Sequence, residues 1–239
     1  MIRYVCAMCP GLDLPAHIRY RLYAYPRTPE HIEFTILDSG AFGLSRAGSR
    51  IGVKHMHKLA AYYEQYVGEG VCCVAPDVYL DPSQTMRNWD WWQKHMGVPV
   101  APVIQFRKER QIDLYVALRQ ARYYAHWEPD IVFISNPGLR AIESSEIAVV
   151  CRVIRQVTGA RWLHNLGAGW DPADIIAWRE MGCFDSIDSI AYYTDAQSGW
   201  AWRMDGKRTL CKREWLDIAR DNAQVANVLA TNMKGGKTC

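Results

Sequence analysis

The chain has 239 residues, of which 49% are hydrophobic and 22% are charged, and its formal net charge is +3. This composition is typical of a globular protein and excludes disordered and fibrous classes, while the small net charge does not by itself indicate a nucleic-acid-binding protein. Because no linker divides residues 1–239, we expect a single domain that buries a substantial core.

Short apolar runs alternate along the chain with longer segments of helical periodicity. The first predicted strand is RYVCAM at residues 3–8, and further strands are predicted at residues 31–39, 71–77, 99–105, 130–136, 160–169 and 184–193. Helices are predicted at residues 54–68, 82–97, 113–127, 144–159, 171–182 and 212–230. Strands that are apolar on both faces and alternate with helices are typical of a parallel sheet covered by helices.

Seven or eight strands in this alternation favour a (β/α)8 TIM-like barrel, complete or slightly abbreviated, over an open doubly wound sheet. No GxGxxG motif follows the first strand, and no GxxxxGK[ST] motif occurs in the sequence. Dinucleotide-binding and P-loop functions are therefore not expected, and we expect no cofactor.

The eight cysteines favour reduced thiols over disulfides, because Cys72 and Cys73 are adjacent in an apolar run and Cys151 lies in a helical pattern. Reduced thiols indicate a cytoplasmic location. Cys6 and Cys9 form a CxxC pair, but no second CxxC follows, so we expect no metal. The sequence has no signal peptide and no apolar run of membrane-spanning length, so we expect neither export nor a membrane partner.

Residues 35–43 read TILDSGAFG and place Asp38 where a predicted strand ends. An acid at this position either caps the following helix or lies at the carboxyl end of a parallel strand, where barrel active sites are built. Polar residues or glycines also end the later strands: Asp77, Gln105, Asn136, the glycines of HNLGAG, and Asp188. Such a series is expected to converge on one rim of a barrel.

Several carboxylates and amides around one cavity suit glycosyl chemistry. Two acids in different environments can act as a nucleophile and a proton donor, and one carboxylate can capture a sugar carbon. Other acids and amides can bind a planar base, which glycines allow to approach the backbone closely. Two alternatives remain open: a barrel glycoside hydrolase with tryptophans as sugar platforms, and a non-catalytic nucleic-acid-binding barrel.

Six motifs occur in an order that resembles the tRNA-guanine transglycosylase superfamily: DSGAFG, VAPDVYLDP, PVIQ, ISNPGL, HNLGAG and IDSIAYY. Together they span roughly residues 34–195. Members of this superfamily exchange guanine for a 7-deazaguanine within a nucleic acid. The resemblance therefore implies a base-exchanging pentosyltransferase, and because members often dimerise it leaves a homodimer open.

By matched position, the resemblance implies that Asp188 is the nucleophile that attacks C1′ of the sugar, and that Asp38 is the general acid/base that handles the proton of the base. The segment FDSIDS also contains Asp185, an alternative nucleophile. We favour Asp188, because the residues SIAYY after it match the superfamily better and because it lies nearer the strand exit. Residues three apart in a strand point to opposite faces, so only one of the two can face the cavity.

The resemblance also implies a set of residues that bind the base. Phe42 would stack on one face of the heterocycle, and Leu166 would close the other. The base edge and its exocyclic groups would be contacted by Asp77, Gln105, and the backbone of Asn136, Gly138 and Gly167.

The sequence departs from the members that act on tRNA. Those members carry a CxCxxC motif and a distant histidine as a zinc site after the nucleophile strand, whereas only Cys211 and Cys239 follow that strand here. We also expect no added RNA-binding domain. In this the chain resembles the phage-type enzymes that insert 7-deazaguanines into DNA. We therefore expect DNA as the polymer, with tRNA as the alternative, and a 7-deazaguanine such as preQ0 as the incoming base. A phage-encoded protein would act in the host cytoplasm.

Two groups of basic residues form either a solvated surface or contacts to the phosphates that flank the target nucleotide. They are Arg46, Arg50 and Lys54 after the first acidic motif, and Arg203, Lys207 and Arg208 after the last predicted strand.

Overall fold

The computed structural model describes residues 2–9, 12–16, 18–29, 34–49, 51–106, 114–135, 144–168 and 170–231. Its centre is a parallel sheet of eight strands in the order β4-β3-β2-β1-β8-β7-β6-β5. The strands are β1 (Arg3–Ala7), β2 (Tyr20–Ala24), β3 (Phe34–Asp38), β4 (Val71–Cys73), β5 (Val103–Ile104), β6 (Ile131–Ser135), β7 (Trp162–Leu166) and β8 (Ser186–Ser189).

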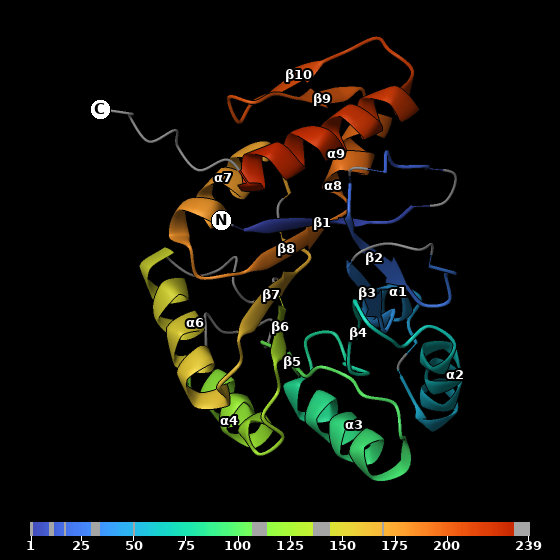
Figure 1. Ribbon diagram of the computed structural model, residues 1–239, viewed down its shortest axis with the longest axis vertical. Helices are drawn as coiled ribbons and strands as arrows, with labels where there is room; N and C mark the ends of the chain where they lie inside the picture. Colours follow the sequence, from blue (N-terminus) through green and yellow to red (C-terminus); the bar gives the residue numbers. More distant parts are fainter. Residues whose placement is uncertain are drawn as a thin grey trace.

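The sheet curls around a common centre (Figure 1), and residues that flank its two outermost strands form a bridge. Val74, which follows β4, forms a parallel bridge with Ala101, which precedes β5. The Ala101 N–H donates to the Cys73 carbonyl at 2.8 Å, and the Ala75 N–H donates to the Ala101 carbonyl at 2.9 Å. The strands therefore follow one another around the centre in chain order, which confirms the predicted (β/α)8 TIM-like barrel in its abbreviated form.

Helices cover the outside of the strands (Figure 1). They are α1 (Ala41–Arg46), α2 (Val53–Glu64), α3 (Pro82–His95), α4 (Leu114–Ala125), α6 (Ser144–Thr158), α7 (Pro172–Met181), α8 (Ala191–Gln197) and α9 (Trp215–Thr231). No described residue between β1 and β2, or between β2 and β3, is helical. In this respect the described part of the barrel is abbreviated. None of the described helices is long and apolar enough to cross a membrane.

Local sequence signals explain where these helices begin and end. The Asp81 carboxylate accepts a hydrogen bond from the Gln84 N–H at 2.9 Å, and Pro82 is the first residue of α3. Asp171 caps α7 in the same way, because a side-chain acceptor satisfies an N–H that has no partner within the helix. Helix α7 then ends at Gly182, whose φ of 66° is accessible to glycine at little cost.

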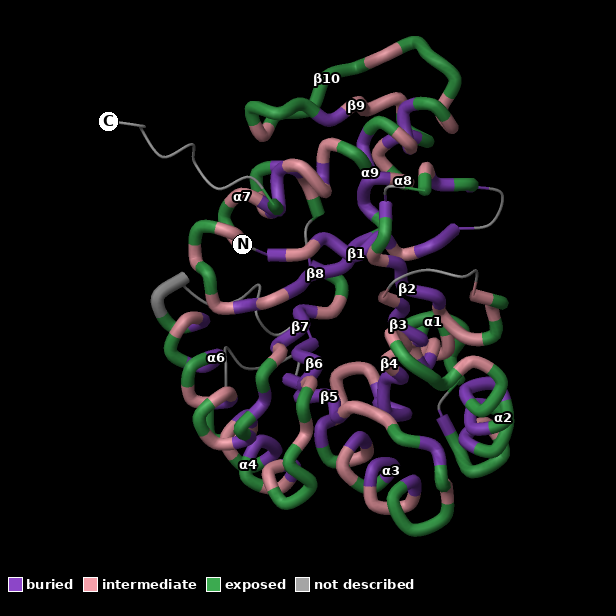
Figure 2. The backbone as a smooth tube through the Cα atoms, in the orientation of Figure 1, coloured by how far each residue is buried: buried purple, intermediate pink, exposed green. Residues whose placement is uncertain are grey.

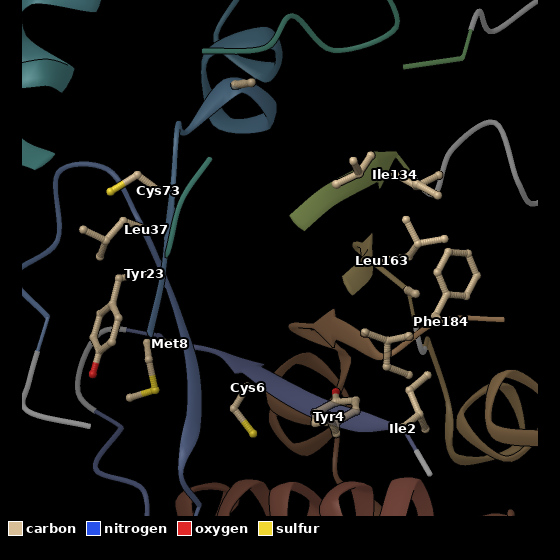
Figure 3. Packing of buried hydrophobic residues seen from close by; sticks show 14 of the residues in the cluster. Ile2, Tyr4, Cys6, Met8, Tyr23, Leu37, Cys73, Ile134, Leu163 and Phe184 are labelled. Atoms are coloured by element: carbon tan, nitrogen blue, oxygen red, sulfur yellow. The ribbon is translucent and has the colours of Figure 1, made fainter. Parts of the chain in front are cut away.

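The barrel has two separate apolar layers, because successive residues of a strand point to opposite faces. Alternate residues of the strands fill the interior of the ring: Val5, Leu22, Ile36, Val74, Val103 and Phe133. Their neighbours form the larger layer around the outside of the ring, beneath the helices (Figure 3): Tyr4, Cys6, Tyr23, Leu37, Cys73, Ile134 and Leu163.

Bulky side chains line the amino-terminal end of the barrel. The Phe34 ring stacks on Trp162 with centroids 5.5 Å apart, and the Arg3 guanidinium lies 4.2 Å from the centroid of the same tryptophan. Arg3 Nε also donates a hydrogen bond to the Tyr20 hydroxyl at 3.1 Å. With this end filled, the carboxyl ends of the strands are the place for a site.

Several features differ from the sequence-based prediction. Strand β2 was not predicted, because Arg21 interrupts its apolar run; the arginine is buried and donates to the Leu14 and Ile18 carbonyls at 3.2 Å each. A hairpin of β9 (Trp200–Trp202) and β10 (Arg208–Leu210) was also not predicted, and much of it is exposed (Figure 2). The strand predicted at residues 184–193 ends at Ser189, and Tyr192 and Tyr193 belong to α8.

Candidate active site

Asp38 is the last residue of β3 and does not cap the helix that follows. The first turn of α1 has Gly40 at its N-cap and no side-chain cap, while the Gly40 N–H donates to Asp38 Oδ2 at 3.1 Å. Burial raises the pKa of Asp38 to about 7, and the nearby carboxylates of Asp77 and Asp188 raise it as well. A carboxyl group with this pKa can both donate and accept a proton near neutral pH.

Asp77 is held between two polar side chains. Its Oδ1 accepts from the Ser39 hydroxyl at 2.6 Å and its Oδ2 accepts from Gln105 Nε2 at 2.6 Å. Burial raises the pKa of the Asp77 carboxyl, and these two hydrogen bonds oppose the rise. Asp77 and Gln105 are therefore one buried unit, as their places at the ends of neighbouring strands predict.

Gln105 keeps one unsatisfied acceptor. Its backbone N–H and carbonyl bond to the side chain of Gln120 at 3.0 and 2.9 Å, and its Nε2 is committed to Asp77. Its Oε1 is buried and has no hydrogen-bond partner within the described chain. Because an unpaired buried acceptor costs free energy, this oxygen is suited to accept an N–H from a ligand.

Asp188, in β8, is held by two donors that bind the same oxygen. His164 Nε2 and the Gly167 N–H both lie 2.9 Å from Asp188 Oδ1. Behind the histidine, Nδ1 lies 2.6 Å from the Ser186 hydroxyl, which accepts from Trp162 Nε1–H at 2.7 Å. His164 was not among the residues predicted from the sequence; the signal for it was its position two residues before Leu166, which places both on one face of β7.

Asp185 lies elsewhere. Its carboxylate accepts from the Leu163 N–H at 2.7 Å and forms an ion pair with Arg155 of α6 at 2.8 Å. Its backbone carbonyl accepts from the Arg3 N–H at the start of β1, so the residue lies at the amino end of the strands. Of the two candidate nucleophiles, Asp188 is the one that lies with Asp38, because residues three apart in a strand face opposite sides.

The residues expected to stack on a base lie on separate elements. Phe42 is on α1, is 53% exposed, and meets Tyr79 edge-on with centroids 5.2 Å apart. Leu166 ends β7 and packs against the interior layer. Gly167 was expected to contact the base through its backbone, whereas its N–H binds Asp188. The other two predicted contacts, Asn136 and Gly138, lie outside the described residues.

The basic residues divide into two surfaces. Arg46 and Lys54 are exposed on α1 and α2, which follow the strand that carries Asp38, and Arg50 lies outside the described residues. The other group, Arg203, Lys207 and Arg208, lies on the β9–β10 hairpin, which Figure 1 shows beyond α9 from the strands. Arg203 pairs with Asp205 at 3.3 Å and Arg208 with Asp195 at 3.2 Å, which reduces the net positive charge of the hairpin.

Among the described residues, no group of three or more His, Cys, Asp or Glu side chains could hold a metal ion. Cys6 and Cys9 are free thiols, and burial raises the pKa of Cys6 to about 12 and that of Cys9 to about 11. The arrangement at the carboxyl ends instead combines a proton donor, a held carboxylate and an unpaired acceptor.

No protein-family model matches the chain, and no curated protein matches it either.

Proposed function

We propose that this protein is a DNA-guanine transglycosylase, which exchanges guanine in DNA for a 7-deazaguanine base such as preQ0 through a covalent glycosyl-aspartate. One observation carries the proposal: the carboxyl groups of Asp38 and Asp188, from separate strands, lie close enough for one to raise the pKa of the other. Their environments differ. The pKa of Asp38 is about 7, whereas the Asp188 carboxylate accepts hydrogen bonds from two donors. Such a division suits an acid and a nucleophile.

In the first step, Asp188 attacks C1′ of the deoxyribose. The C1′–N9 bond breaks, its electron pair goes to N9 of guanine, and protonated Asp38 supplies the proton, so that neutral guanine leaves. In the second step, N9–H of the incoming base passes its proton to the Asp38 carboxylate and attacks C1′. The ester bond breaks, and its electron pair returns to Asp188.

Asp77 and Gln105 are the proposed reader of the base edge. Guanine and 7-deazaguanines share donors at N1 and at the 2-amino group, and carboxylate and amide oxygens accept from such donors. The buried, unpaired Oε1 of Gln105 supports this role. Because the shared edge carries the recognition, one pocket can hold both the leaving and the entering base.

A target nucleotide in duplex DNA has to be flipped out, at a cost of a few kcal/mol. We propose that stacking of the flipped base on Phe42 offsets this cost. Phe42 is half exposed and lies in α1, directly after the strand that carries Asp38. The exposed side chains of Arg46 and Lys54 follow the same strand and are the favoured phosphate contacts.

The test offers single-stranded DNA, duplex DNA and tRNA separately to the purified protein, each with radiolabelled guanine or preQ0. We expect label in DNA and no label with Asp188→Asn. The control is Asp185→Asn, which makes the same change at the amino end of the strands, away from the proposed site, and should retain exchange. Circular dichroism confirms that both variants fold. Label in tRNA alone would replace DNA by tRNA as the polymer, and no label in any polymer would refute base exchange. Release of reducing sugar from oligosaccharides would favour a glycoside hydrolase.

A further inference from the structure

The two oxygens of the Asp188 carboxylate have different surroundings. Oδ1 receives both His164 Nε2 and the Gly167 N–H at 2.9 Å. Within the described chain, no hydrogen bond reaches Oδ2. The aspartate is 6% exposed and the histidine is fully buried, so water does not compete for Oδ1 on the histidine side.

The protons of the chain behind Asp188 can be assigned from donor capacity. Trp162 Nε1–H can only donate, so the Ser186 oxygen accepts from it at 2.7 Å. The single hydroxyl proton of Ser186 is then available to His164 Nδ1, 2.6 Å away. Because the ionised Asp188 carboxylate can only accept, a neutral imidazole carries its proton on Nε2, where it points at Oδ1. A neutral histidine therefore satisfies every contact of the chain, and its ring is fixed at both nitrogens.

We propose that His164 is a positioning residue that commits Asp188 Oδ1 to become the carbonyl oxygen of the glycosyl ester and leaves Oδ2 as the atom that attacks C1′. The inference rests on the proposed function for its chemistry, whereas the hydrogen-bonded chain exists without substrate. Ser186 and Trp162 act one step further back, because the Ser186 hydroxyl satisfies Nδ1 in the tautomer in which His164 donates to the carboxylate, and Trp162 fixes that hydroxyl.

The two donors at Oδ1 also affect the balance between free carboxylate and ester. Hydrogen bonds to an ionised acceptor are roughly twice as strong as those to a neutral one. His164 and Gly167 therefore stabilise the free carboxylate more than the ester carbonyl, and they favour departure of Asp188 in the second step. Loss of the histidine donor removes part of this preference, so the ester becomes more populated while orientation of Oδ2 is lost.

The activity test compares His164→Leu, which has no donor, with His164→Gln, whose amide N–H reaches about as far as Nε2. We expect kcat for base exchange to fall about 100-fold in His164→Leu, with KM for DNA unchanged, and to recover at least tenfold in His164→Gln. The fraction of protein trapped as covalent DNA adduct at equilibrium should rise about fivefold in His164→Leu. Unchanged kcat in His164→Leu, or a lower adduct fraction, would overturn the inference.

A second measurement needs neither substrate nor the buried leucine variant. Nitrogen NMR of the unmodified protein, with the His164 signals identified by their absence in His164→Gln, should show a protonated Nε2 and an unprotonated Nδ1. Ser186→Ala leaves Nδ1 without its donor, so it should loosen the ring and lower kcat about tenfold while Nε2 keeps its proton, because the Asp188 carboxylate can only accept. A proton on Nδ1 in the unmodified protein would overturn the inference. If no polymer exchanges base, the proposed function fails, and the NMR result still decides the position of the histidine proton.

Discussion

His164 Nε2 lies 2.9 Å from Asp188 Oδ1, although the two residues are 24 positions apart in the chain. The contact follows from the parallel register of neighbouring strands, which pairs His164 of β7 with Ser186 of β8. Asp188 lies two residues beyond Ser186 on the same face of its strand. A fully buried histidine thus contacts both, with one ring nitrogen for each.

The raised pKa of Asp38 predicts that the folded protein loses stability as pH rises. Burial and neighbouring carboxylates raise its pKa from 3.8 to about 7 in the folded protein, so between these values the folded state holds a proton that the unfolded state has released. The free energy of unfolding should therefore fall from about pH 4 to about pH 7 and then level off. Asp38→Asn removes this contribution, and thermal melting across the range should show the variant gaining stability relative to the unmodified protein as pH rises.

The control for that melting series is Asp130→Asn, because the Asp130 carboxylate is exposed and pairs with Arg161 on the surface. Its curve should run parallel to that of the unmodified protein. Asp77, whose pKa is also raised by burial, leaves a residual slope in Asp38→Asn. Parallel curves for Asp38→Asn and the unmodified protein would contradict the raised pKa.

In the proposed exchange, the same group should set the pH dependence of the first chemical step. Under the proposed mechanism, guanine release in a single turnover requires the protonated form of Asp38, whose pKa is about 7. The rate should be nearly constant below that pH and fall about tenfold per unit above it. Rapid-quench measurement of released guanine checks this, and a rate that rises with pH would exclude Asp38 as the proton donor.

Gln105 should contribute to base affinity. Gln105→Leu removes the unpaired Oε1 and also the Nε2 donor to Asp77 Oδ2. We expect the affinity for preQ0, measured by calorimetry, to fall about tenfold or more, since each hydrogen bond to a charged or buried group is worth about 1.5 kcal/mol. Gln65→Leu is the matched control, because Gln65 is exposed on the surface after α2. Equal affinities in the two variants would remove Gln105 from the proposed pocket.

Trp162 should support both the barrel and the site. Its ring stacks on Phe34 and lies under the Arg3 guanidinium, and its Nε1–H donates to Ser186. Trp162→Ala should lower the free energy of unfolding in urea by about 2 kcal/mol, below the usual range for a core tryptophan because the residue is only partly buried. Trp162→Phe should retain most of that stability but weaken base exchange. If Trp162→Ala were as stable as the unmodified protein, the packing role would be refuted.

The sequence by itself was sufficient for most of the barrel, because hydrophobic periodicity and caps are local. The run IVFIS in β6 and the Asp81–Pro82 start of α3 are examples, and the structure has both where they were predicted. Strand β2 could not be recognised in this way, since buried Arg21 breaks its apolar pattern and is satisfied only by carbonyls that the fold brings to it. Local patterns carry no information about such partners.

The sequence also indicated that acids and an amide end several strands. Because parallel strands bring their carboxyl ends to one rim, these residues were expected to lie together. Only the tertiary structure separated Asp188 from Asp185, since that choice depends on which face of β8 points into the ring. Only the tertiary structure shows that His164 contacts Asp188, and that the Gly167 N–H donates to the same carboxylate, where a contact to a base was expected. These contacts depend on the register between neighbouring strands, which is set by the packing of the whole barrel and cannot be predicted from either segment alone.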